Sequence, residues 1–178
     1  MPKTSLMLAI TLLSACSSSQ AQRTPLFATD ESRLSAADQA AIHASFTERF
    51  SVASDGLHFL YEGCGEIPVE TEVVDLNNDG TAEVFIYWGN SCTSGHTGRS
   101  LSLYVKDSSG AWGDQLGFAA FDYTILPASN AGYPDLEFGG PGFCFAVWSW
   151  NGSRYDFKCN SPQEAGGCQY TGNVCQTE

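Results

Sequence analysis

The sequence has few basic residues and no apolar segment long enough to cross a membrane. Its 8 lysines and arginines stand against 20 aspartates and glutamates, which gives a formal net charge of −12. Such a chain repels the phosphates of nucleic acids and anionic lipid headgroups, so we expect no nucleic-acid partner. The apolar run at residues 6–13 is much shorter than the roughly 20 residues that a membrane-spanning helix needs.

The sequence also lacks the usual signatures of catalysis. It contains three histidines and no GxSxG, HExxH or paired-carboxylate pattern. Cys92 and His96 could form a nucleophile and base, but a disulfide cysteine beside a loop histidine explains the same residues more simply. We therefore expect a binding protein rather than an enzyme.

The N-terminus has the three parts of an export signal. Lys3 supplies positive charge, residues 6–13 form the apolar core, and Leu13-Ser14-Ala15-Cys16 resembles the lipobox of bacterial lipoproteins. This resemblance implies a signal peptide over residues 1–15, cleavage before Cys16 and acylation of Cys16, with the lipid anchoring the chain to a membrane. Ser17 after the cysteine resembles sorting to the outer membrane, on the periplasmic side. An ordinary secretory signal cut after Ala21 is the alternative.

The rest of the chain divides into a tether and one domain. Residues 16–33 are mostly small and polar and are typical of a flexible linker. Residues 34–178 have the length of a single domain. From Cys16 onward the chain keeps seven of the eight basic residues and all 20 acidic ones, so its formal charge is −13.

Six cysteines remain after Cys16, an even number that favours disulfides in an exported chain. Asn151-Gly152 between two apolar runs predicts a hairpin with a two-residue turn. That register places Cys144 directly opposite Cys159, within disulfide range. Proximity then pairs Cys168 with Cys175 and leaves Cys64 for Cys92. The alternative, a metal site formed by these cysteines, is not indicated, because the sequence contains no CxxC spacing.

The pattern of elements predicts an all-β fold with one N-terminal amphipathic helix. Ser35 and Asp38 form an acidic variant of a capping box, and Ile42, Phe46 and Phe50 recur on one face of a helix over 36–50. Short strands without helical crossovers follow, which indicates antiparallel sheets in a sandwich or a propeller-like array. The expected strands are 57–61, 69–74, 83–88, 101–106, 121–126, 135–138, 144–150 and 154–158.

Residues 75–83 carry the clearest chemical motif. Oxygen-bearing side chains stand at loop positions 1, 3, 5 and 9, and glycine stands at position 6, as in loops that bind Ca²⁺. The predicted ligands of a structural calcium are the side chains of Asp75, Asn77 and Asp79, the carbonyl of Thr81, and Glu83. Ile86 replaces the position-12 glutamate of an EF-hand, and the flanks resemble strands, so the loop resembles the calcium loops of β-rich extracellular repeats. A metal-free hairpin turn rich in Asp and Asn is the alternative.

Two glycine-containing loops are candidates for contact with a protein partner. One contains Ser94, Gly95 and His96 next to Cys92, and the other covers residues 139–143 and presents Phe143. Both also fit simple structural turns.

Taken together, these motifs over residues 57–159 resemble a group of small bacterial periplasmic lipoproteins. The group includes immunity proteins of Xanthomonas-type type IV secretion systems, which neutralise lysozyme-like effectors. The chain is also similar in outline to periplasmic inhibitors of invertebrate-type lysozyme, with which Ser94-Gly95 shares a loop dipeptide. The resemblance implies an all-β fold, a structural calcium, and inhibition of a basic peptidoglycan hydrolase by loop insertion. A calcium-stabilised binding or structural lipoprotein of the envelope is the second hypothesis.

Overall fold

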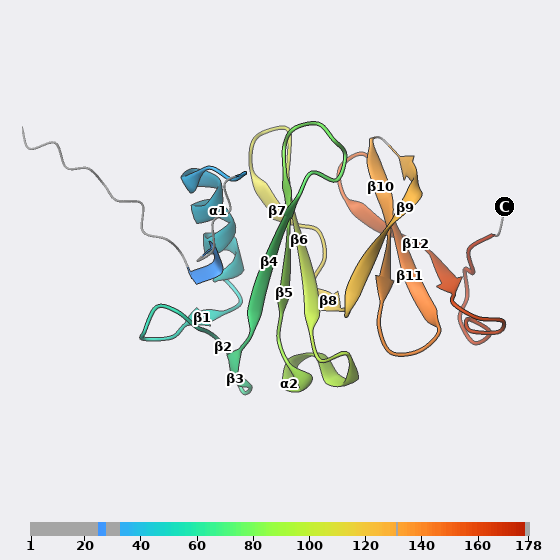
Figure 1. Ribbon diagram of the computed structural model, residues 1–178, viewed down its shortest axis with the longest axis horizontal. Helices are drawn as coiled ribbons and strands as arrows, with labels where there is room; N and C mark the ends of the chain where they lie inside the picture. The colour runs from blue at the N-terminus through green and yellow to red at the C-terminus, as the bar shows by residue number, and fades with distance from the viewer. Residues whose placement is uncertain (1–24, 28–32, 131, 177–178) are drawn as a thin grey trace, which may run out of the picture.

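The computed structural model describes residues 25–27, 33–130 and 132–176 (Figure 1). The signal peptide and Cys16 lie outside these residues, as does all of the tether except 25–27 and residue 33. The elements in chain order are η1 (Pro25–Phe27), α1 (Ala36–Phe46), β1 (Ser51–Val52), β2 (Phe59–Tyr61), β3 (Gly65–Ile67), β4 (Val69–Val74), β5 (Glu83–Trp88), α2 (Ser91–Ser94), η2 (Gly95–Thr97), β6 (Ser100–Lys106), β7 (Trp112–Asp114), β8 (Phe118–Ala119), β9 (Asp122–Asn130), β10 (Tyr133–Gly139), β11 (Cys144–Trp150) and β12 (Tyr155–Pro162).

The strands form three sheets, and the named strands pair antiparallel throughout, as predicted. A small N-terminal sheet has the order β1-β2-β3. The central sheet has the order β4-β5-β6-β7, with β8 also paired to β6. The C-terminal sheet has the order β12-β11-β10-β9.

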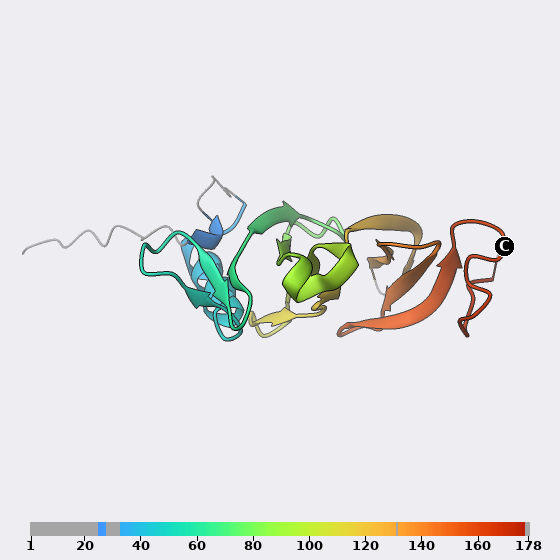
Figure 2. The ribbon, with the colours of Figure 1, turned by 90° about the horizontal axis from the view of Figure 1, so that it is seen from below.

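The central sheet is covered on both faces, because its inner strands β5 and β6 carry apolar side chains on both of their faces. Every residue of β5 is buried. Val84 and Ile86 point into a core shared with α1 and the N-terminal sheet. Phe85 points the other way, into a second core shared with Leu136 and Trp150 of the C-terminal sheet. The two larger sheets therefore form a sandwich, with helix α1 outside the central sheet (Figures 1 and 2).

Helix α1 begins where the capping residues predict and ends earlier than expected. The Ser35 hydroxyl accepts a hydrogen bond from the Asp38 N–H at 3.1 Å, which satisfies one of the free donors of the first turn. The helix stops at Phe46, where the Thr47 hydroxyl bonds back to the His43 carbonyl at 2.9 Å. Phe50 lies beyond the helix but is still buried, with its ring stacked on that of Phe46 at 4.3 Å.

The hairpin of β11 and β12 has a different register from the predicted one. Its loop has four residues rather than two, because the Asn151 side chain accepts the N–H groups of Ser153 and Arg154 at 2.9 and 3.0 Å. One extra residue, Lys158, then bulges out of β12, so Val147 pairs with Cys159. Cys144 faces Pro162 instead.

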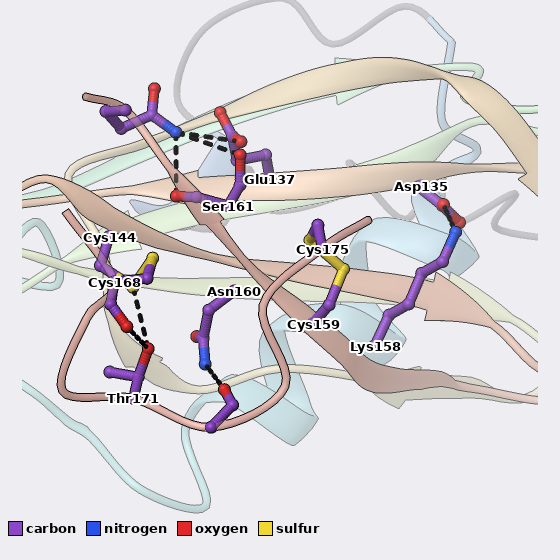
Figure 3. Close-up of a disulfide and its surroundings, with 12 residues drawn as sticks. Asp135, Glu137, Cys144, Lys158, Cys159, Asn160, Ser161, Cys168, Thr171 and Cys175 are labelled. Carbon is purple, nitrogen blue, oxygen red and sulfur yellow. Dashed lines mark hydrogen bonds and ion pairs between the residues drawn. A yellow bond between two sulfur atoms is a disulfide. The ribbon is translucent and has the colours of Figure 1, made fainter. Parts of the chain in front are cut away.

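Two of the three predicted disulfides are consequently wrong. With three residue steps between them along the ladder, Cys144 and Cys159 are separated by about 10 Å, beyond the reach of a disulfide. Both cysteines bond to residues 163–176, which we call the C-terminal strap, and the bonds are Cys144–Cys168 and Cys159–Cys175 (Figure 3). The third prediction, Cys64–Cys92, is confirmed.

The C-terminal strap is held to the C-terminal sheet by more than its disulfides. The Asn160 N–H donates to the Asn173 carbonyl at 2.7 Å, and the Cys175 N–H donates to the Asn160 carbonyl at 2.8 Å. Gly167 passes so close to the Phe143 carbonyl that a Cβ there would collide with it. The strap lies beyond the C-terminal sheet, at the end of the molecule that is farthest from helix α1 (Figure 1).

The disulfides also bear on the compartment in which the protein folds. Three disulfides among six cysteines indicate an oxidising compartment outside the cytoplasm. Among the described residues, no helix has the length and apolar character needed to cross a membrane.

Candidate functional site

The loop over residues 75–83 joins β4 to β5 and folds around its own side-chain oxygens. The two carboxylate oxygens of Asp75 accept the N–H groups of Asp79 and Gly80 at 3.1 and 3.0 Å. The Asn77 Oδ1 also accepts the Asp79 N–H, and Asp79 Oδ1 accepts the Thr81 N–H at 2.7 Å. The turn needs a left-handed backbone at Gly80, where φ is 88°.

The side chains of three of the five predicted ligands could hold a hard cation. Asp75, Asn77 and Asp79 keep oxygen lone pairs beyond those that the loop N–H groups use, and the tight turn holds them on one short segment. Bonds from the Thr81 N–H and the Asn77 amide lower the pKa of Asp79, so that carboxylate stays ionised. Only two carboxylates take part, and no cluster of three or more His, Cys, Asp or Glu side chains suited to a metal occurs in the described ranges.

Glu83, the fifth predicted ligand, is engaged elsewhere. Its side chain is buried, and its two oxygens accept the Leu76 N–H at 2.8 Å and the Tyr133 hydroxyl at 2.9 Å. Burial raises the pKa of this carboxyl, although the two hydrogen bonds oppose that shift. Glu83 therefore links the loop to strand β10, and both of its oxygens already accept hydrogen bonds.

The segment that contains Ser94, Gly95 and His96 forms a short, rigid corner between β5 and β6. Asn90 caps helix α2 in a reciprocal capping box with Thr93, and the Cys64–Cys92 bond fastens the segment to the N-terminal sheet. Because Cys92 is oxidised, a Cys92/His96 nucleophile pair is excluded. Gly95 and His96 are exposed at the tip of this corner.

Ser94 does not belong to the exposed tip. Its side chain is buried, and its hydroxyl lies 2.8 Å from that of Ser100 at the start of β6. A hydroxyl in this position stabilises the corner and is out of reach of a partner. Of the predicted partner-binding residues, Gly95, His96 and Phe143 remain at the surface.

The two predicted loops meet at the same end of the molecule. Helix α2 and the β10–β11 loop both lie at the lower end in Figure 1. A cavity of about 520 Å³ between them is lined by His96 and Pro141, one from each loop, together with Phe121 and Phe145. Phe121 and Phe143 are each 57% exposed, an unusual amount of aromatic surface to leave in water. We call Gly95, His96, Phe121, Pro141 and Phe143 the loop surface.

An acidic and aromatic cluster beside the loop surface was not apparent from the sequence. The Arg99 guanidinium lies between the rings of Tyr87 and Phe121, at 4.3 and 4.6 Å from their centroids. The Tyr87 hydroxyl lies 3.3 Å from a carboxylate oxygen of Glu72 and equally far from one of Asp122. Burial and the Glu72 carboxylate raise the pKa of Tyr87 well above its usual range, so its hydroxyl remains a donor.

These residues come from four strands or their ends, β4, β5, β6 and β9, and no local spacing connects them. The exposed pair Phe121-Asp122 at the start of β9 was the only local hint. The cluster places carboxylates and aromatic rings next to the loop surface.

The chain was compared with known proteins at the level of families, sequences and structures. No protein-family model matches it, no curated protein matches its sequence, and no solved structure matches its fold.

Proposed function

We propose that the protein is an exported inhibitor, or immunity protein, that binds a basic lysozyme-like peptidoglycan hydrolase and blocks its glycan cleft. The observation that carries this proposal is the convergence of two loops, picked out separately in the sequence, on one exposed aromatic surface. The loop surface projects His96 and Phe143 from a rigid scaffold. The protein acts by binding and performs no catalysis itself.

The charge of the chain supports a basic partner. Enzymes that act on the anionic cell wall tend to be basic, and the formal charge of −13 from Cys16 onward would steer them toward this protein. Glu72 and Asp122 lie directly beside the loop surface, where they would meet lysine or arginine side chains around a cleft. Such complementarity chiefly raises the association rate and falls with added salt.

The rigidity of the corner at His96 supports insertion as the mode of binding. The Cys64–Cys92 bond, the capping box and the buried Ser94 hydroxyl fix the backbone before the partner arrives. A preorganised loop loses little conformational entropy on binding, so more of its contact energy appears as affinity.

Export and anchoring complete the proposal. Lipidation of Cys16 would hold the domain on the periplasmic side of the outer membrane, where an incoming hydrolase attacks the wall. Calcium bound by Asp75, Asn77, Asp79 and the Thr81 carbonyl would stiffen the β4–β5 loop there. This structural site lies apart from the loop surface and supports the fold rather than the partner contact.

A wall-lysis assay tests the inhibitor. The purified protein, with its disulfides formed, is added to hydrolases of several lysozyme types and to any hydrolase encoded beside its gene. We expect inhibition of at least one, with Phe121→Ala weakening it by about tenfold or more, the loss typical of an aromatic anchor. Tyr170→Ala removes an aromatic side chain that is 93% exposed outside the loop surface, and should leave inhibition unchanged. An absence of inhibition in every case overturns the proposal.

The Asp75 loop favours the second candidate, a calcium-stabilised binding or structural lipoprotein of the envelope. This candidate needs the loop and the anchor but makes no use of the loop surface. It would gain support if the chain bound purified wall or envelope components with unchanged affinity after Phe121→Ala while failing to inhibit any hydrolase.

A further inference from the structure

The outer face of the C-terminal sheet, which points away from the central sheet, carries a second cavity. It measures about 700 Å³ and contains Asp135 and Glu137 of β10, Val147 of β11, and Lys158 of β12. Leu126 and Pro127 line it on the side of β9. Asn173, Val174, Cys175 and Gln176 of the C-terminal strap line the opposite side.

The strand register explains why these side chains share one face. Glu137 pairs with Val147, and Val147 pairs with Cys159, so the three form a row across the sheet. The bulge at Lys158 puts two consecutive residues on this face, since Lys158 reaches Asp135 while Cys159 bonds to the strap. Bulges commonly re-aim a side chain in this way beside functional sites.

Asp135 is the unusual member of the cavity. Only 3% of its side chain is exposed, and Lys158 Nζ contacts its Oδ2 at 2.6 Å (Figure 3). Its Oδ1 is fully buried and has no hydrogen-bond partner among the described residues. A buried carboxylate oxygen without a donor is destabilising by about 1–3 kcal/mol, so such an atom calls for a ligand or another compensating group.

The side chains that line the cavity carry a formal excess of one negative charge, which one more cation would balance. Asp135 and Glu137 bring two negative charges, and Lys158 brings one positive charge. Among the side chains that the structure describes, the Glu137 carboxylate receives only a neutral amide donor, Gln163 Nε2 at 3.2 Å. The Lys158 side chain is 46% exposed, so it can move toward water and allow another cation to approach Asp135.

We propose that this cavity binds a ligand with a primary ammonium group on a short aliphatic chain. The ammonium would donate to Asp135 Oδ1 and to the Glu137 carboxylate, two positions along the same strand. The aliphatic chain would lie against Val147, Leu126 and Pro127. A free diamine and a lysine-type side chain of a peptide share this chemistry, and the site lies on a different face from the loop surface.

Nuclear magnetic resonance of the disulfide-bonded protein tests the site directly. Amide shifts are followed while 1,5-diaminopentane or N-acetyl-lysine methylamide is added at physiological ionic strength. We expect saturable shifts confined to β10, the bulge at Lys158 and the C-terminal strap. If the diamine alone binds, the source is a free amine, and if the blocked lysine also binds, the source can be a peptide. The Nε-acetylated lysine derivative, which lacks the charge, should produce no shifts.

Variants separate the site from general attraction to an acidic protein. Asp135→Asn should weaken binding of the diamine by about tenfold or more, as expected for the loss of a charge-assisted hydrogen bond. Asp55→Asn removes one negative charge from an exposed turn in the N-terminal part of the chain, and should leave binding unchanged. Shifts that spread over the acidic surface, or equal effects of the two variants, would overturn the proposal.

A rescue experiment covers the case in which Asp135→Asn does not fold. Lys158→Ala removes the three outer methylenes and the ammonium, which leaves the buried Asp135 without its partner and lowers the thermal midpoint. Added n-propylamine matches the missing atoms and should restore part of that midpoint in a saturable manner. The same amine should not raise the midpoint of Asp55→Asn, and a failure to rescue Lys158→Ala would contradict an ammonium site.

Discussion

Asp38 joins the start of helix α1 to the central sheet, and we expect its loss to destabilise the fold by a predictable amount. Its Oδ1 accepts hydrogen bonds from Lys106 Nζ at 2.7 Å and from Trp112 Nε1 at 2.9 Å. The Ser35 hydroxyl donates to Oδ2 at 2.8 Å. One carboxylate thus connects the helix cap to β6 and β7.

The pKa of Asp38 gives the magnitude. The hydrogen bonds from Lys106 and Trp112 lower this pKa from 3.8 to about 2. At about 1.4 kcal/mol per pKa unit, the shift corresponds to at most about 2.4 kcal/mol of stability. The side chains of Asp38 and Lys106 are 22% and 30% exposed, so water screens part of the interaction. We therefore expect Asp38→Asn to lower the free energy of unfolding by about 1–2 kcal/mol at pH 7.

The pH dependence has a definite sign. Because the pKa of Asp38 is lower in the folded state, the unfolded chain takes up the proton first as the solution is acidified. The stabilisation is complete well above pH 3.8 and is lost as the pH falls through about 2. The difference in unfolding free energy between the wild type and Asp38→Asn should therefore stay constant from pH 6 to about pH 5 and shrink from there to pH 2.

Urea unfolding followed by circular dichroism at several pH values measures this difference. Glu70→Gln is the matched control, since Glu70 is 76% exposed and lies 3.9 Å from Arg99, and it should change stability by less than about 0.5 kcal/mol. A loss for Asp38→Asn that is equally small at pH 7, or that does not vary with pH, would refute the argument.

Three further predictions concern the loops and the disulfides. Calcium should raise the thermal midpoint, by the equivalent of about 2.7 kcal/mol at 100 times its dissociation constant. EGTA or the Asp79→Ala substitution should abolish that rise. The control variant Asp107→Asn, in the β6–β7 turn, should retain it. An unchanged thermal midpoint of the wild type on addition of calcium would exclude a stabilising calcium. Peptide mapping without reduction should recover Cys144–Cys168 and Cys159–Cys175, and replacing Cys159 and Cys175 by serine should be destabilising by about 3 kcal/mol for a loop of this length. Ser94→Ala should lower stability by about 1 kcal/mol yet leave hydrolase inhibition intact in the folded protein, whereas a loss of inhibition would show that its hydroxyl contacts the partner.

The elements that could be predicted from the sequence are those whose signals are local. The cap at Ser35 depends on a side chain three residues from its donor. The strand at 69–74 follows from alternating residues, and the strands at 83–88 and 144–150 follow from apolar runs. Each of these three strands has the predicted bounds. The helix end was less accessible, because Phe50 continues the apolar spacing although a loop, rather than the helix, brings it into the core.

The candidate site was predictable only in parts. Glycine, serine and cysteine content marked the two loops, but their convergence depends on how the central and C-terminal sheets stack. Ser94 and Glu83 show the limit of motif matching, since both occupy the expected positions while the fold turns their side chains inward. Phe121 and Arg99 meet across different strands and leave no pattern along the chain.

The predicted hairpin register and two predicted disulfides were wrong for reasons that begin at Asn151. A two-residue turn would align Cys144 with Cys159, but the Asn151 side chain stabilises a four-residue loop and shifts β12 by two residues. The bulge at Lys158 adds a third residue, which frees both cysteines for the C-terminal strap. It also places Lys158 over Asp135, beside a cavity that the strap closes. The Asn151 cap and the Lys158 bulge together therefore set the hairpin register on which the two disulfides and the proposed ammonium site depend.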